Sequence, residues 1–111
     1  TLTFAEGTEP LSIGQFAFYG CNGLESVTFP KNLAVLGDSV FGMCEGLTSV
    51  TFTEGTVELT VGRTAFGRCT SLVSVKLPSN LKSISKYAFI RCHDDLVIEG
   101  EWESKVDPTE E

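Results

Sequence analysis

The 111-residue sequence has few of the residues from which catalytic and metal sites are built. His93 is the single histidine, and the spacing of the chain places no serine or carboxylate partner beside it. Asp94 and Asp95 adjoin it, but a polar loop explains this pair more simply than a metal site does. Glycine-rich phosphate loops, nucleophile elbows and metal-ligand motifs are lacking. We therefore expect no enzyme activity, no cofactor and no bound metal.

Long apolar runs and an excess of positive charge are lacking too. No stretch of about 18 consecutive apolar residues occurs, so we expect no membrane insertion. Eight basic residues against 15 acidic ones give a net charge of −7, which argues against nucleic-acid binding because phosphate backbones need positive contacts. The chain opens at Thr1 without a methionine or signal peptide, and we expect a processed or excised piece of a longer protein.

What the sequence does contain is a fourfold internal repeat. Its cysteines are 23, 25 and 23 residues apart, and a phenylalanine stands three residues before each: Cys21, Cys44, Cys69 and Cys92 follow Phe18, Phe41, Phe66 and Phe89. Long and short units therefore alternate, with a 48-residue super-repeat. Repeats of 20 to 50 residues indicate a solenoid, because one unit cannot bury its own apolar face.

Within a unit, the alternation of apolar and polar residues predicts a strand with one buried face. In residues 24–29, Val27 and Phe29 point to one side, and Pro30 then ends the strand because it cannot donate to a ladder. We expect Asp38 or Ser39 to cap a single helical turn in the return segment. Stacked units predict a right-handed coil of the α/β class, with a parallel β-sheet, short helical or 3-10 turns, and loops.

Written as a pattern, the unit reads L-x-x-V-x-F-P-x-x-L-x-x-[IL]-G-x-x-x-F-x-x-C, which resembles the BspA-like leucine-rich repeat of bacterial cell-surface proteins. The resemblance covers roughly residues 2 to 100 and implies a leucine-rich repeat solenoid. It also implies an extracellular or cell-surface location, and a non-catalytic module that binds a host or bacterial surface protein in adhesion. A structural spacer that presents another domain is the alternative. We expect a monomer.

The final unit departs from the pattern. Asp95 stands where a core leucine is expected, and residues 92–100 resemble the degenerate closing unit of such arrays. Residues 94–102 are therefore expected to form a C-terminal cap. We expect residues 1–100 to form about four units, as a fragment of a longer array or protein, and residues 101–111 to be an acidic C-terminal cap or tail. Trp102 is expected to cover the last core layer, and the chain beyond it to fray.

The cysteines are expected to be a buried ladder of free thiols. All four occupy the same repeat position and point the same way, with neighbours about 4.8 Å apart, whereas the Cβ atoms of a disulfide average about 3.8 Å. Zinc needs ligands that converge on one point rather than follow an axis. A disulfide and a metal site remain the less favoured alternatives.

Basic residues are concentrated in one part of the sequence. Residues 63–93 contain six of them and no acidic residue: Arg63, Arg68, Lys76, Lys82, Lys86 and Arg91. The repeat stacks Arg63 on Lys86 and Arg68 on Arg91, and like charges in adjacent coils repel unless an anion lies near. Either the acidic tail or solvent screens them, or the patch binds an anionic partner, such as an acidic protein or a sulfated glycan.

Three aromatic residues stand where sister units have smaller ones. Phe16 and Tyr87 share a column with Ser39 and Thr64, and Tyr19 shares one with two glycines and Ile90. Such residues are either interface anchors or packing over the ends of the coil. The candidate binding residues are therefore Arg63, Arg68, Lys76, Lys86, Arg91, Phe16, Tyr19 and Tyr87.

Overall fold

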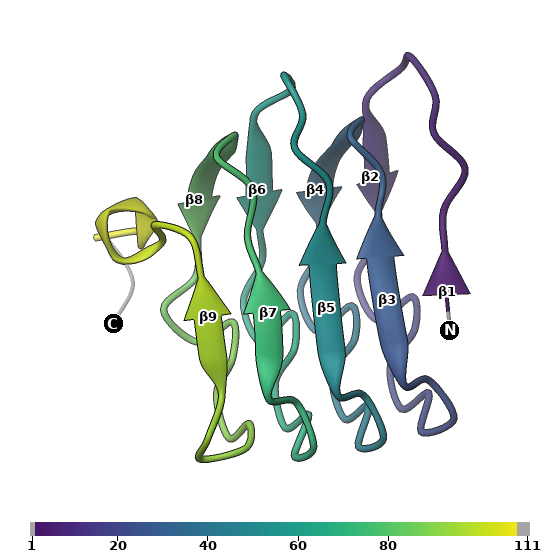
Figure 1. The fold of residues 1–111 in the computed structure, drawn as a ribbon, viewed down its shortest axis with the longest axis vertical. Coiled ribbons are helices and arrows are strands. Elements are labelled where there is room, and N and C mark those ends of the chain that lie inside the picture. Colours follow the sequence, from purple (N-terminus) through teal and green to yellow (C-terminus); the bar gives the residue numbers. More distant parts are fainter. Residues whose placement is uncertain (1, 109–111) are drawn as a thin grey trace.

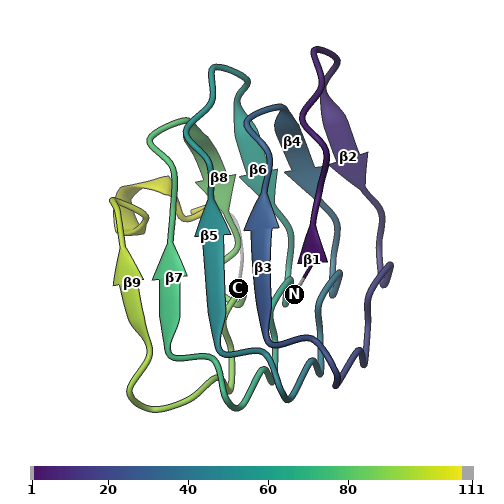
Figure 2. The same ribbon diagram turned by 45° about the vertical axis from the view of Figure 1, so that its right-hand side comes forward.

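The computed structural model describes residues 2–108, which form a parallel β-solenoid of about four coils (Figure 1). The first sheet contains, in spatial order, β1 (Leu2–Thr3), β3 (Ser26–Phe29), β5 (Ser49–Phe52), β7 (Ser74–Lys76) and β9 (Val97–Glu99). The second sheet contains β2 (Leu11–Ile13), β4 (Leu33–Leu36), β6 (Leu59–Val61) and β8 (Leu81–Ile84). Zig-zag turn segments lead from each strand of the second sheet to the next strand of the first (Figure 2).

The strand register is the one that the repeat predicts. Ser26 pairs with Ser49, which pairs with Ser74, and the adjacent valines align in the same way. Inside, the rings of the repeat phenylalanines stack with interplanar angles of 9° and centroid distances of 5.0, 5.6 and 5.5 Å: Phe18, Phe41, Phe66 and Phe89. The core is therefore a set of aligned columns, as expected for a leucine-rich repeat solenoid.

The expected helical turn in the return segment is wrong in detail. The N–H groups of Phe41 and Met43 donate to the carbonyls of Ala65 and Gly67 in the next coil, each at 2.8 Å. These donors are then not available for bonds along a helix, and Ser39 and Met43 have positive φ angles of 53° and 59°. The segment is a chain of tight turns that forms a third inter-coil ladder.

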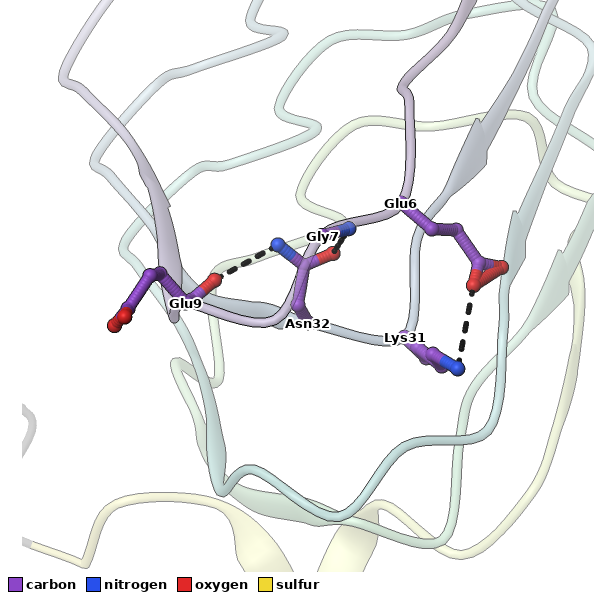
Figure 3. Close-up of polar contacts among 5 residues, drawn as sticks. All are labelled: Glu6, Gly7, Glu9, Lys31 and Asn32. Carbon is purple, nitrogen blue, oxygen red and sulfur yellow. Dashed lines mark hydrogen bonds and ion pairs between the residues drawn. The ribbon is translucent and has the colours of Figure 1, made fainter.

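The long coils carry an extra loop, which an asparagine of the next coil holds in place (Figure 3). The Asn32 side chain accepts a bond from the Gly7 N–H at 3.4 Å and donates to the Glu9 carbonyl at 2.9 Å. Beside it, Lys31 lies 3.8 Å from a carboxylate oxygen of Glu6. The same clamp recurs 48 residues later, which explains why the super-repeat contains two unequal units.

That second clamp has the same geometry as the first. Asn80 accepts a bond from the Gly55 N–H at 3.2 Å and donates to the Val57 carbonyl at 2.7 Å. Ser79 takes the place of the lysine, and its N–H and hydroxyl both donate to Glu54, which lowers the pKa of that carboxyl. Each long loop is therefore tied to the following coil at two points.

The C-terminal residues close the end of the solenoid. As expected, Trp102 packs against the core, with its ring edge-on to Phe89 at 6.5 Å. The expectation that the chain frays beyond it is wrong for residues 103–107. After the 3-10 helix η1 (Glu103–Lys105), Val106 also packs on the core, and the Asp107 N–H donates to the carbonyl of Ile84 at 3.2 Å. These contacts cover the open edge of β8.

Residues 109–111 lie outside the described part of the chain, so the boundary at residue 101 stays a prediction. In the last coil, Asp95 is exposed and Leu96 packs on the core in its place. Among residues 2–108, no helix has the length and apolar character needed to cross a membrane.

Candidate functional site: a basic and aromatic turn face

The outward surface of the turn segments, residues 14–21, 37–44, 62–69 and 85–92, is called the turn face below. Its backbone is tied from coil to coil, with the N–H groups of Phe18, Phe41 and Phe66 each donating 2.8 Å bonds to the neighbouring coil. Each side chain of the turn face therefore has a fixed position in a column. A residue that departs from the repeat therefore places a different side chain at a defined position in its column.

Seven of the eight candidate binding residues lie on the turn face. The sequence indicated the basic residues and the aromatic residues as two separate features, and the fold brings them onto one surface. Lys76 is the exception, because it lies on the exposed side of β7, in register with Thr51 and Glu99. It does not belong to the same surface as the seven: Phe16, Tyr19, Arg63, Arg68, Lys86, Tyr87 and Arg91.

Tyr87 lies close to two stacked cations. The Arg63 guanidinium carbon is 4.7 Å from the centre of its ring, and the Lys86 ammonium is 5.0 Å from it. Cation–π attraction of this kind offsets part of the repulsion expected between the two basic side chains. Tyr87 is also partly buried rather than fully exposed, so its ring already serves contacts within the chain.

Arg68 and Arg91 are exposed and hold the backbone in a left-handed conformation, with φ angles of 60° and 58°. Gly20 occupies the same column in the first coil, where this conformation carries no steric cost. Within residues 2–108, no carboxylate forms an ion pair with Arg63, Arg68 or Arg91. The acidic residues between 94 and 108 therefore do not neutralise these three cations by direct contact.

Phe16 and Tyr19 form an edge-to-face pair at the first coil, with ring centroids 5.4 Å apart. Their side chains are 53% and 51% exposed, which is unusual for residues of this size. The Tyr19 ring lies over the next coil, where a Cβ atom at Gly42 would be 2.9 Å from its Cδ1 atom. A glycine at this position therefore leaves room for the Tyr19 ring.

A groove of about 130 Å³ runs between the aromatic and the basic parts of the turn face. Its apolar lining comes from Tyr19, Met43 and Ile90, and Arg68 borders it. Met43 and Ile90 were not predicted as site residues. Sequence did offer a signal, because Gly42 and Gly67 share a column with Tyr19 and Ile90, and small residues between large ones leave a depression.

The cysteines form the expected ladder of free thiols, in which Cys44 and Cys69 are buried, whereas Cys21 and Cys92 at the ends are only partly buried. Each thiol from the second coil onward donates to a phenylalanine carbonyl of the preceding coil: Cys44 to Phe18 at 3.2 Å, Cys69 to Phe41 at 3.2 Å, and Cys92 to Phe66 at 3.1 Å. Burial raises the pKa of all three, that of Cys92 to about 11. Protonated, buried thiols are poor nucleophiles and ligands, so their role is structural.

His93 takes part in a local turn rather than in a cluster of reactive groups. Its Nδ1 atom accepts a bond from the Asp95 N–H at 3.0 Å, and both side chains are exposed. Among residues 2–108, no group of three histidine, cysteine or carboxylate side chains is arranged to hold a metal ion.

The fold and its stacked columns define a leucine-rich repeat solenoid, a class that generally mediates protein binding and is generally not catalytic. Residues 2–98 match the model of the BspA type leucine rich repeat region, in six copies, and the chain belongs to this family. No match to a curated protein is found.

One similar solved structure is the leucine-rich repeat protein of T. pallidum, with 25% identity and a TM-score of 0.50. The match covers 79% of this chain and 51% of that protein, so the chain spans about half the length of its relative.

Proposed function

We propose that this chain is a non-catalytic, protein-binding module of a bacterial cell-surface or secreted protein, and that it acts in adhesion. Membership of the BspA type family supports this role. The observation that carries the proposal is the turn face, where the exposed aromatic side chains Phe16 and Tyr19 share a surface with the exposed basic side chains Arg68 and Arg91. A spacer needs no such departures, because stacking alone holds its coils together.

The same basic residues suggest a second candidate, recognition of an anionic glycan. Arg68 and Arg91 occupy one column in adjacent coils, which places two cations about 4.8 Å apart along the backbone lattice. Sulfated chains bind such rows through charge alone, and their affinity falls steeply with added salt. The two candidates differ in whether the apolar part of the turn face contributes.

The test compares two double variants of equal charge. R68E/R91E reverses two cations of the turn face, whereas K76E/K82E reverses two cations on the sheets, and each makes the net charge of −7 more negative by four. Labelled protein is incubated with epithelial and bacterial cells at several salt concentrations, and bound protein is measured by flow cytometry. We expect R68E/R91E to lose binding and K76E/K82E to retain it.

Treatment of the cells separates the candidates. Protease treatment removes a protein receptor, whereas heparinase treatment removes a sulfated glycan, so binding that survives protease but not heparinase favours the glycan. A wild-type chain that binds no cell type, or two variants that bind equally well, would favour the spacer role and refute the proposal.

A further inference from the structure

We infer that the groove of the turn face binds an extended acidic segment of a partner protein, with one apolar side chain in the groove and flanking carboxylates on Arg68 and Arg91. This inference rests on the proposed function and names the chemistry of the partner. Its basis is the position of an apolar depression directly beside two cations that lack a carboxylate partner within residues 2–108.

The shape of the groove sets the size of the group that enters it. Tyr19, 51% exposed, and Ile90, 38% exposed, both line the groove, together with the buried Gly42 and Gly67 that lie between them in the column. A Cβ atom at Gly67 would lie 3.4 Å from the Ile90 side chain, so the glycine column keeps the depression open. A volume of about 130 Å³ suits one apolar side chain, since a cavity of about 150 Å³ holds one benzene molecule.

The cations set the chemistry on one side of that group. Arg68 lines the groove itself, and Arg91 follows in the same column of the next coil. Both residues are exposed, and a guanidinium group can bind a carboxylate through two parallel hydrogen bonds. A partner with carboxylates next to its apolar residue would satisfy both features at once.

The backbone of the turn face makes an added strand an unsuitable mode of binding. In the third coil, the N–H groups of Phe66 and Arg68 donate to the next coil at 2.8 and 2.7 Å, while those of Ala65 and Gly67 are used within the turn. Recognition must therefore proceed through side chains. A sulfated glycan has no apolar side chain to place against Tyr19 and Ile90, so the lining favours a polypeptide.

The test uses a fluorescein-labelled nonapeptide with a central leucine flanked by glutamates, titrated with the wild-type chain and followed by anisotropy. Two matched peptides carry alanine for the leucine or glutamine for the glutamates. Because an apolar contact and a pair of charge contacts each supply on the order of 1.4 kcal/mol, we expect about tenfold weaker binding for either peptide. Resonances of Tyr19 and Ile90 should shift on titration.

Protein variants complete the test. I90S removes one apolar wall and R68E/R91E removes the cations, and we expect each to weaken the leucine peptide about tenfold, while K76E/K82E leaves it unchanged. Equal binding of the leucine and alanine peptides, or better binding of heparin than of any peptide, would overturn the inference. Loss of cell binding in R68E/R91E without any peptide binding would overturn it and leave the proposed function standing.

Discussion

Asn80 should contribute far more to stability than its position in a turn between two strands suggests. Its side chain joins two coils by accepting a hydrogen bond from the Gly55 N–H at 3.2 Å and donating one to the Val57 carbonyl at 2.7 Å. An Asn80→Ala substitution removes both bonds and leaves two backbone groups without their partner. At about 1 kcal/mol for each hydrogen bond, the expected loss in the free energy of unfolding is about 2 kcal/mol.

The assay is urea denaturation followed by circular dichroism, with thermal unfolding as a second measurement. A loss of about 2 kcal/mol corresponds to a fall in Tm of roughly 8 °C for a chain of this size. Asn22→Ala is the matched control, because Asn22 is exposed and makes one bond, from the Glu45 N–H at 3.2 Å. We expect this control to stay within about 0.5 kcal/mol of the wild type.

Asn80→Asp tests the direction of the bonds. An aspartate keeps the acceptor for Gly55 but places a charged oxygen against the Val57 carbonyl at neutral pH. Its penalty relative to the wild type should shrink below about pH 4, where a protonated carboxyl can donate in place of the amide. If Asn80→Ala and Asn22→Ala unfold at the same urea concentration, the clamp does not hold the long loop and the reasoning is wrong.

Three further predictions concern strain, packing and titration. Arg68→Gly should be about 1 kcal/mol more stable than Arg68→Ala in urea, since φ is 60° there and both lose the charge; equal midpoints would contradict the strain. Phe41→Ala should lose about 3–5 kcal/mol, because the ring is fully buried between two others; a loss below about 1 kcal/mol would argue against the stack. Burial raises the pKa of Cys92 from 9.0 to about 11, so the unfolded chain deprotonates first. The stabilisation that comes from the protonated Cys92 thiol is fully present below about pH 8.5 and is lost as the pH rises toward 11. The urea midpoint should therefore fall over this range, and it should fall less steeply in Cys92→Ser.

The register of the first sheet followed from the sequence because a fixed period aligns every coil with the next, whereas the second sheet, in the return segments, was not predicted. Once Val27 and Phe29 were assigned to the buried face, the spacing determined their partners in the neighbouring coil, and the strand pairs Val27–Val50 and Phe29–Phe52 confirm it. The thiol ladder followed in the same way. Properties that depend only on repetition could therefore be predicted from one chain.

The conformation of the turn segment could not be predicted from local preferences. Asp38 and Ser39 are good helix caps, and capping is a property of a few consecutive residues. The segment adopts tight turns instead, because the N–H groups of Phe41 and Met43 bond to residues 24 positions away. Residues 103–107 show a similar limit, since a single apolar residue, Val106, in an acidic stretch gives no period from which packing could be inferred.

The sequence indicated the basic and the aromatic residues of the candidate site, but not that they share one surface. Charge and aromatic content each singled out residues that lie on the turn face, yet Lys76 was assigned to the same group because it shares a sequence interval with the others. Its place on β7 separates it from them. A stretch of sequence passes through every face of a coil, so nearness in sequence does not indicate a shared surface.

Backbone ladders on all sides of the coil limit where recognition can arise. Because hydrogen bonds between coils use the backbone groups of the sheets and of the turn segments, a partner can distinguish one coil from another only by side chains that depart from their column. Tyr19 lies in the first coil, Arg68 in the third and Ile90 in the last, and all three border one groove. A partner that contacts all three side chains must extend across the coils along the solenoid axis. Removal of the terminal coil should therefore weaken its binding even when the remaining coils stay folded.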